Sequence, residues 1–207
     1  MRLRFDPVKG EARITLPPRA ALKSALSWAA EQSAWIENQC LRMTGTVRIE
    51  DGATIPIEGR PVRIVATGTP GRRIVLEEDV MIVGGPVAHA GGRALRWLKA
   101  RAHETLAAET QDLARAHGLP LSSVSIGDPR ARWGSCASNG AIRYSWRLIL
   151  APPDVRLATV AHEVAHLVHM HHGPDFHALV RDISAACPDR ARAWLRREGA
   201  GLHRYTG

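Results

Sequence analysis

The sequence has few cysteines and no long apolar run. Its 207 residues include three cysteines, Cys40, Cys136 and Cys187, which lie far apart and form no CxxC pair. This excludes a disulfide-stabilised miniprotein and favours a reducing compartment, the cytoplasm. Because no stretch reaches the roughly eighteen apolar residues of a membrane span, and the first ten residues lack the apolar core of a signal peptide, we expect no membrane partner.

Acidic residues are fewer than basic ones. Lys and Arg total 28 against 20 Asp and Glu, which gives a formal net charge of +8. The excess is spread over both halves of the chain, so it allows a weak association with a polyanion or nucleic acid, although a solvated Arg-rich surface is the simpler interpretation. With 45% hydrophobic residues and six Trp, the chain can bury enough apolar surface to fold.

The first ninety residues favour strands. Short apolar runs are separated by turn residues such as Asp51-Gly52, Gly59 and Gly84-Gly85, which predicts a β-rich N-terminal region. One stretch with helical spacing of its apolar residues, 20–43, predicts a single helix within this region. The expected strands are 3–5, 12–16, 47–49, 54–57, 62–65, 73–76 and 80–83.

The second half favours helices around a small sheet. Apolar spacing predicts a helix over 92–117, with Gly118 at its left-handed stop and Gly91-Gly92 as the boundary between regions 1–90 and 91–207. The Asn139-Gly140 turn predicts one antiparallel hairpin from strands 130–136 and 141–150, preceded by a strand at 124–126. Prolines then open three predicted helices, at 153–169, 174–186 and 188–198.

Six of the ten histidines fall between residues 162 and 177. His162 and His166 are four residues apart on the predicted helix 153–169, so their rings lie on one face and can bind one metal ion. Glu163 lies between them, in the HExxH pattern, and can reach a metal-activated water. Since the surrounding residues are apolar, these histidines need polar partners, which a metal would supply.

A hydrolytic zinc site needs three protein ligands and an open position for water. His169 shares the helix face, but three ligands strung along one helix do not easily form a compact tetrahedral base. We favour His172, because it follows His166 by six residues and the Gly-Pro pair directly after it breaks the chain. His171 and His177 remain the alternatives.

With zinc in place, the site would hydrolyse amide bonds. Zinc acidifies a water and polarises the carbonyl, while Glu163 acts as general base and passes the proton to the leaving amine. The developing oxyanion needs a further donor. The candidates, which the sequence does not rank, are Arg132, Tyr144, His169, His171, His177 and Tyr205.

Several tracts resemble the YgjP-like metallopeptidase family, whose relatives are the SprT-like zincins. The tracts are 132–136, Gly140, Ile142, 146–148, the HExxH motif, His172 and Phe176, and the likeness covers nearly the whole chain. The resemblance implies an α+β fold in which a zincin-like catalytic domain, a small antiparallel sheet packed on the HExxH helix, follows the β-rich region. It also implies zinc on His162, His166 and His172, with Glu163 as general base. The chain departs from the family pattern at Ser145, His171, Gly173 and His177.

The strand beginning at residue 141 is a candidate substrate-binding element. It runs through a short link into the helix that carries His162, so an extended peptide paired with it would lie beside the metal. The SprT-like resemblance implies the same arrangement, and the alternative is that this strand is internal to the sheet. The candidate substrate-binding residues are Ala141, Ile142, Arg143, Tyr144 and Trp146.

A zinc-dependent peptidase acting on protein or peptide substrates is therefore the predicted function. The main alternative is a nucleic-acid-associated or structural zinc-binding module without hydrolytic activity, and a third is a metal scavenger that uses the clustered histidines. A glutamate at position 163 favours the peptidase, because a structural site needs no general base. Cys136 is either a fourth zinc ligand or, in the simpler interpretation, a small buried residue of the hairpin.

Overall fold

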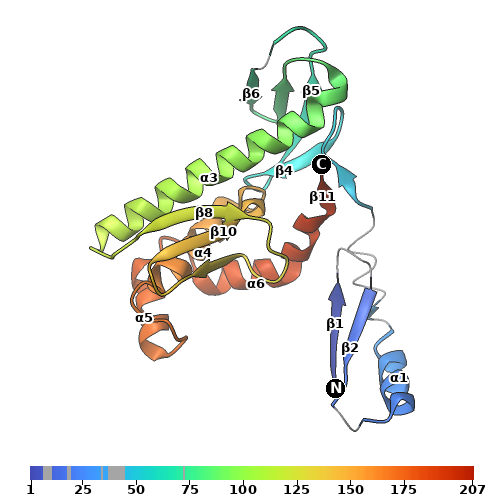
Figure 1. The fold of residues 1–207 in the computed structure, drawn as a ribbon, viewed down its shortest axis with the longest axis vertical. Helices are drawn as coiled ribbons and strands as arrows, with labels where there is room; N and C mark the ends of the chain where they lie inside the picture. The colour runs from blue at the N-terminus through green and yellow to red at the C-terminus, as the bar shows by residue number, and fades with distance from the viewer. Residues whose placement is uncertain (7–10, 18–19, 34, 37–44, 72) are drawn as a thin grey trace.

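The computed structural model describes residues 1–207 except 7–10, 18–19, 34, 37–44 and 72. Runs of strands and runs of helices follow one another along the chain, which confirms a mixed α+β fold. Strands β1 (Arg2–Asp6) and β2 (Glu11–Thr15) pair antiparallel, and helix α1 (Leu22–Glu31) follows them. Figure 1 shows this unit set apart from the other elements. Residues 34 and 37–43 of the predicted helix 20–43 lie outside the described residues.

A four-stranded sheet follows, as the short apolar runs predicted. Its order is β4 (Thr54–Ile57), β5 (Arg60–Ala66), β7 (Val80–Val83) and β6 (Ile74–Glu77), with β5 and β7 parallel and the other pairs antiparallel. The tight β4–β5 reversal places Glu58 and Gly59 at positive φ, 52° and 78°, as a two-residue hairpin turn requires. One face of the sheet is buried through alternate residues of β4, β5 and β7.

The long helix α3 (Ala90–Ala116) joins this sheet to the second half of the chain. Its buried residues recur every four positions and include several alanines, which let neighbouring elements approach closely. They are Ala90, Ala94, Leu98, Ala102, Leu106, Thr110 and Ala114. The helix confirms the prediction for residues 92–117, and Gly118 takes the predicted left-handed conformation, with φ of 63°.

The predicted boundary at residue 90 does not separate two cores. Gly91 and Gly92 lie within the first turns of α3 rather than in a linker. One continuous buried cluster draws residues from both sides, among them Ile55 and Met81 before the boundary and Leu148 and Val160 after it. Figure 1 shows α3 running from the β4–β7 sheet at one end to β8 at the other, so this helix belongs to both halves.

The three-stranded sheet in the second half of the chain is mixed rather than antiparallel. Strand β10 (Ala141–Ser145) lies between β8 (Ser123–Gly127) and β9 (Gly134–Cys136). The β9–β10 pair is the predicted antiparallel hairpin, but β8 pairs with β10 in parallel, so the prediction of an antiparallel sheet is wrong for that pair. The predicted strand 141–150 ends early, because the chain enters a 3-10 turn, η2 (Trp146–Ile149), capped by the Ser145 hydroxyl, which accepts from the Arg147 amide.

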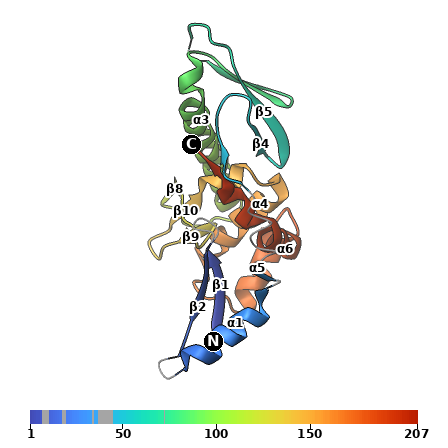
Figure 2. The same cartoon turned by 90° about the vertical axis from the view of Figure 1, so that its right-hand side faces the viewer.

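Three helices and a short strand complete the chain. They are α4 (Pro153–Ala165), α5 (Pro174–Ile183) and α6 (Pro188–Glu198), followed by the 3-10 turn η3 (Gly199–Arg204) and strand β11 (Tyr205–Thr206). Each helix begins with the predicted proline. Strand β11 pairs in parallel with β3 (Val47–Arg48), and Figure 2 shows the last residues lying beside α3. Among the described residues, no helix is both long and apolar enough to cross a bilayer.

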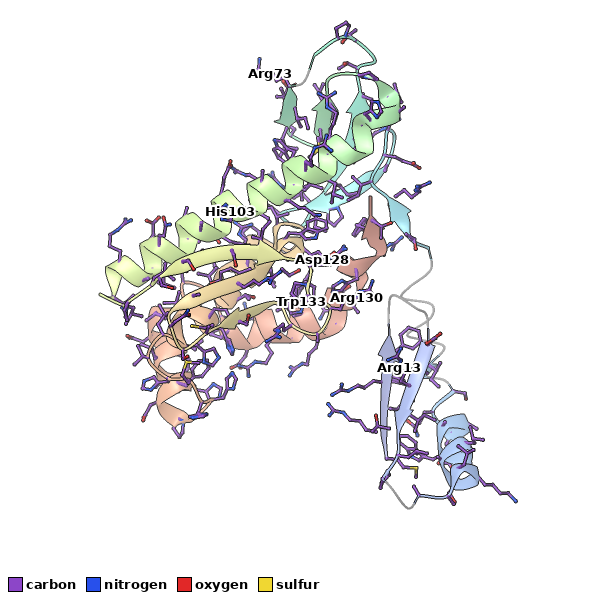
Figure 3. The ribbon with its side chains drawn as sticks, viewed as in Figure 1. Arg13, Arg73, His103, Asp128, Arg130 and Trp133 are labelled. Carbon is purple, nitrogen blue, oxygen red and sulfur yellow. The ribbon has the colours of Figure 1, made fainter. Side chains whose placement is uncertain are left out.

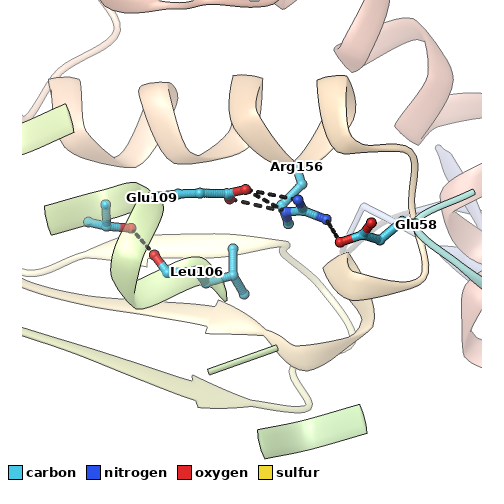
Figure 4. A network of polar contacts seen from close by, with 5 residues as sticks. Glu58, Leu106, Glu109 and Arg156 are labelled. Carbon is cyan, nitrogen blue, oxygen red and sulfur yellow. Dashed lines mark hydrogen bonds and ion pairs between the residues drawn. The ribbon is translucent and has the colours of Figure 1, made fainter. Parts of the chain in front are cut away.

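A buried arginine ties the first turn of α4 to two other elements. Arg156 is only 5% exposed, and its guanidinium donates to both Glu109 oxygens at 2.8–3.1 Å, on α3, and to Glu58 at 3.4 Å, in the β4–β5 turn (Figure 4). The same turn donates its Glu58 amide to the Ile149 carbonyl at 2.8 Å. These contacts fix the helix that carries HExxH against α3 and the four-stranded sheet.

We expect Arg156→Met to destabilise the protein by about 2–4 kcal/mol, because the substitution leaves two partly buried carboxylates without their shared partner. Equilibrium unfolding in urea measures the change. The control is Arg115→Met, which removes an exposed (i, i+3) pair with Asp112 and should cost at most about 0.5 kcal/mol. Equal effects of the two substitutions would contradict the role assigned to Arg156.

A second buried arginine, Arg147, holds the C-terminal segment in place. Its guanidinium donates to both Asp128 carboxylate oxygens at 2.7 and 3.1 Å and to the carbonyls of Leu202 and Tyr205 at 2.8 Å each. Burial would raise the pKa of Asp128, but the hydrogen bond and charge of Arg147 outweigh it and hold that pKa below its usual value. Figure 3 shows Asp128, Arg130 and Trp133 on the loop between β8 and β9.

The stability of the metal-free protein should fall as pH decreases from 6.5 toward 4. Burial and the nearby Arg147 charge lower the pKa of His203 to about 4, so the unfolded chain binds this proton at a higher pH than the folded one does. Above pH 6.5 the ring is neutral in both the folded and the unfolded chain, so His203 lowers stability only below that pH. Since the ring is partly exposed, we expect a loss of only about 1–2 kcal/mol by pH 4.

Urea unfolding between pH 4 and 7 tests this expectation. His203→Gln should make the slope of stability against pH shallower. It should not remove the slope, because the pKa of His162 is also lowered to about 4 by burial and by its neighbouring histidines. An unchanged slope in His203→Gln would show that this side chain does not contribute.

Candidate metal centre

Helix α4 presents two histidines and a glutamate from a largely buried stretch. Val160, Ala161, Val164 and Ala165 are each at most 1% exposed, so the helix is fixed by packing on both sides of the motif. His162 and His166 lie one turn apart, with ring centroids 5.0 Å from each other. The sequence-based expectation of one shared face is therefore correct for these two rings.

The spacing predicted that this helix continues to His169, but it ends at Ala165. The amides of Leu167 and Val168 bond to carbonyls three residues back, at 3.0 and 3.1 Å, which tightens the last turn and releases the chain. This early end lets the following loop fold back before Pro174 starts α5. The loop places the His172 Nε2 atom 3.2 Å from the His162 Nε2 atom.

The structure brings together the three histidines predicted as ligands. One ring nitrogen from each of His162, His166 and His172 lies within 4.8 Å of the other two. Phe176, fully buried on α5, contacts all three rings, with centroid distances of 4.9, 4.5 and 4.8 Å. The Phe176 ring stacks on His166 and meets His162 and His172 edge-on, which restrains the orientation of all three imidazoles. The sequence did not indicate this role beyond the family pattern.

Hydrogen bonding and burial prepare these rings for a metal. His166 Nδ1 lies 2.9 Å from the His169 carbonyl oxygen, which can only accept, so the ring carries its proton there and its Nε2 lone pair is free. Burial, followed by the charges of His166 and His172, lowers the pKa of His162 to about 4. Although His172 is exposed, partial desolvation of its ring, followed by the charge of His166, also lowers its pKa. Neutral imidazoles are the form that binds metals.

The donor set fits a divalent metal with an open position. Three imidazole nitrogens match a catalytic zinc site, and within the described residues no fourth side chain joins the group. Cys136, considered as a fourth ligand, donates its thiol to the Ala137 carbonyl at 3.5 Å. Burial, and then the Glu163 charge, raise the pKa of this thiol, which disfavours the thiolate. His171 and His177 stay outside the group, although His177 stacks on His172 at 6.3 Å.

Glu163 is 5% exposed and faces the segment that begins β9. Burial raises its pKa to about 7, and the positive charge of Arg132 partly opposes that shift. A carboxyl group with this pKa can both accept and release a proton near neutral pH. A cavity of about 250 Å³ lies between β9 and the histidines, lined by Ser135, Cys136 and Met170 as well as the metal site.

Gly134 leaves the space that Glu163 occupies. A Cβ atom at this position would lie 2.5 Å from Glu163 Oε1 and 2.7 Å from its Cδ. With Glu163 as the general base that the sequence predicts, we therefore expect Gly134→Ala to displace the carboxylate and lower the rate of hydrolysis by at least about tenfold, because such a base acts only from hydrogen-bonding distance. Metal content, measured in the same preparations, should stay unchanged.

The control is Gly173→Ala, since a Cβ atom there meets nothing within 4 Å and its φ of −81° suits any residue. Similar rates for Gly134→Ala and wild type would show that this glycine does not position Glu163.

The prediction that a substrate strand pairs with residues 141–148 is wrong. Strand β10 is the central strand, and both its edges are already bonded, to β8 and to β9. Ile142, Tyr144 and Trp146 are at most 2% exposed. Ala141 and Arg143 share the same filled pairing, so none of the five predicted substrate-binding residues offers a free edge. The alternative left open by the sequence, an internal strand, is what the structure shows.

Burial also removes one oxyanion candidate. The Tyr144 hydroxyl lies 3.1 Å from Thr110 Oγ1, within the packing between β10 and α3, and burial strongly raises its pKa. Tyr205 pairs with β3 in a separate two-stranded sheet. Of the polar side chains considered, Arg132 is the one whose charge acts directly on Glu163.

Comparison with known proteins agrees with this geometry. A family model described as YgjP-like, metallopeptidase domain, matches residues 1–198. The chain belongs to the YgjP-like family. Searches of curated proteins and of solved structures gave no match. Family membership indicates a metallopeptidase, and the three-histidine group is a site that can hold its metal ion.

Proposed function

We propose that this protein is a zinc-dependent peptidase, with His162, His166 and His172 as metal ligands and Glu163 as general base. The observation that carries the proposal is the convergence of three ring nitrogens within 4.8 Å next to a buried glutamate whose pKa is raised to about 7. Three imidazoles suit zinc better than the hard, oxygen-preferring cations. When bound, zinc would supply Lewis acidity that polarises a substrate carbonyl and acidifies a water.

The residues of the chain itself handle the proton. The Glu163 carboxylate would accept a proton from the attacking water and then donate it to the amine nitrogen that leaves. Its burial keeps bulk water away from the proton while it is held. The positive charge of Arg132 would stabilise negative charge that develops on the substrate oxygen.

The free edge of β9 is the place for an extended peptide. In the β9–β10 hairpin, the Ala137 amide bonds to Ala141 and the Ser145 amide to the Trp133 carbonyl. Since bonded pairs alternate in an antiparallel ladder, the peptide groups of Gly134 and Cys136 point away from β10. These groups would hold a substrate strand beside Glu163, in place of the β10 pairing that the structure excludes.

Metal analysis combined with a hydrolysis assay tests the proposal. Purified protein should contain about one zinc per chain, and it should cleave an unfolded protein such as denatured casein. A chelator should abolish cleavage, and added zinc should restore it. Protein that binds no metal under non-chelating conditions would overturn the proposal. The nucleic-acid-associated module and the cytoplasmic location remain predictions.

A further inference from the structure

A separate cavity of about 240 Å³ also adjoins Glu163 and His162. Its walls come from α4, α5, α6 and the segment that precedes β9. Because Glu163 must reach the bond that is cleaved, a substrate group in this cavity would lie within a residue or so of that bond. The cavity is therefore placed to select substrates.

The walls of this cavity are apolar and fixed. Trp133, Val180, Ala191 and Leu195 are among its lining residues, and Val180 and Ala191 are at most 4% exposed. Trp133 is held from behind, since a Cβ atom on Gly199 would lie only 2.8 Å from its ring. Preformed apolar walls beside a few charged groups are typical of a ligand-binding cavity.

Two arginines give the cavity its charge. Arg132 and Arg192 line it together with Glu163 and His162, and no other charged residue does so among the described residues. Within the part of the chain that the structure describes, Arg132 makes no ion pair. Arg192 has only a 3.8 Å contact with Asp189, whose side chain is 89% exposed, so water competes for that contact.

The balance of these charges favours an anionic group. Two guanidinium groups and one carboxylate leave a single positive charge before any metal adds its own. A substrate lysine or arginine would be repelled, whereas a carboxylate can accept paired hydrogen bonds from a guanidinium.

We propose that this cavity binds a carboxylate of the peptide substrate, next to the cleaved bond, through Arg132 and Arg192. The inference rests on the proposed peptidase function and adds its substrate class. The carboxylate can come from two sources, an Asp or Glu side chain or the free C-terminus of a peptide. Both present the same chemistry to the two arginines.

Matched peptides test the preference. The zinc-loaded full chain is given one peptide sequence with Glu, Gln or Lys at each position around the cleaved bond, and with either a free or an amidated C-terminus. Mass spectrometry locates the cleavage. We expect kcat/KM to be at least about tenfold higher for one Glu peptide than for its Gln counterpart, the scale of one charge-assisted hydrogen bond, and lowest for Lys. A preference for the free C-terminus instead identifies the second source.

Substitutions connect this preference to the cavity. The double substitution Arg132→Gln/Arg192→Gln should reduce the preference for a carboxylate to at most about twofold, because both guanidinium donors of the charge-assisted hydrogen bonds are replaced by neutral amides. The control is Arg190→Gln, which removes the same charge from the same helix but does not line the cavity. It should keep the full preference. The ratio of rates between peptides is compared rather than the rate itself, because Arg132 also acts on Glu163 and is the proposed stabiliser of the substrate oxyanion.

The results separate the two proposals. Cleavage with equal rates for Glu, Gln and amidated peptides overturns the carboxylate site and leaves the peptidase standing. A preference that survives the double substitution also overturns it. Binding of fluorescein-labelled Glu and Gln peptides, followed by anisotropy, needs no turnover. If no peptide is cleaved but the Glu peptide binds more tightly in an arginine-dependent way, the peptidase proposal fails and the carboxylate site stands.

Discussion

Glu163→Gln should lower peptide hydrolysis by a factor of about 100 to 10,000, the range contributed by a general base. The amide keeps the shape of the side chain but cannot accept the proton. Metal content and melting temperature should change little, because Glu163 is not one of the three residues whose side-chain atoms are grouped for a metal. The neutral amide also removes a buried acid whose ionisation opposes folding above its unfolded pKa, so stability at pH 8 should not decrease.

Steady-state cleavage of one peptide, with zinc measured in the same preparations, checks this expectation. Glu104→Gln is the matched control, because it removes a carboxylate from an exposed position of α3. Near-wild-type turnover in Glu163→Gln would show that another group accepts the proton. Loss of zinc together with activity would place Glu163 in the metal site instead.

His172→Ala should weaken zinc binding by at least about 100-fold, more than the loss of an outer partner of a metal ligand costs. The substitution removes one of the three nitrogens that converge at the site, and hydrolysis should fall in parallel. His171→Ala should change zinc affinity by no more than about threefold, since that ring stays outside the group. His177→Ala should have an effect between these two, because its ring stacks on His172.

Competition with a chromogenic chelator ranks the three variants, and circular dichroism shows whether each remains folded. Since His172 is exposed, its substitution should not unfold the protein. The assignment of the third ligand is wrong if His171→Ala proves the most damaging.

Local patterns predicted the elements that depend on neighbouring residues. Apolar periodicity predicted the strands of the four-stranded sheet and helix α3, and Gly or Pro residues predicted the ends of α3 and the starts of the last three helices. Both signals act within a few residues. The histidine spacing belongs to the same class. His162 and His166 share a face because any helix repeats every 3.6 residues, whatever packs against it.

Long-range contacts decided what the sequence left open. Helix α4 ends at Ala165 rather than at His169, and this early end brings His172 back to His162. No local signal marks that end, since the next helix breaker is Gly173. Strand β10 could not be identified as central from its own residues, because its pairing with β8 joins segments separated by the β9 hairpin.

The sequence by itself determined the metal-binding chemistry: two histidines on one helix face, a glutamate between them and a family motif around residues 132–136. Only the tertiary structure brought His172 to the other two histidines, moved the free strand edge from β10 to β9 and placed two arginines in a cavity that Glu163 also lines. The physical reason is one of range. Periodicity and capping act over a few residues, whereas a free edge, a cavity or a three-residue ligand group exists only when distant segments pack together.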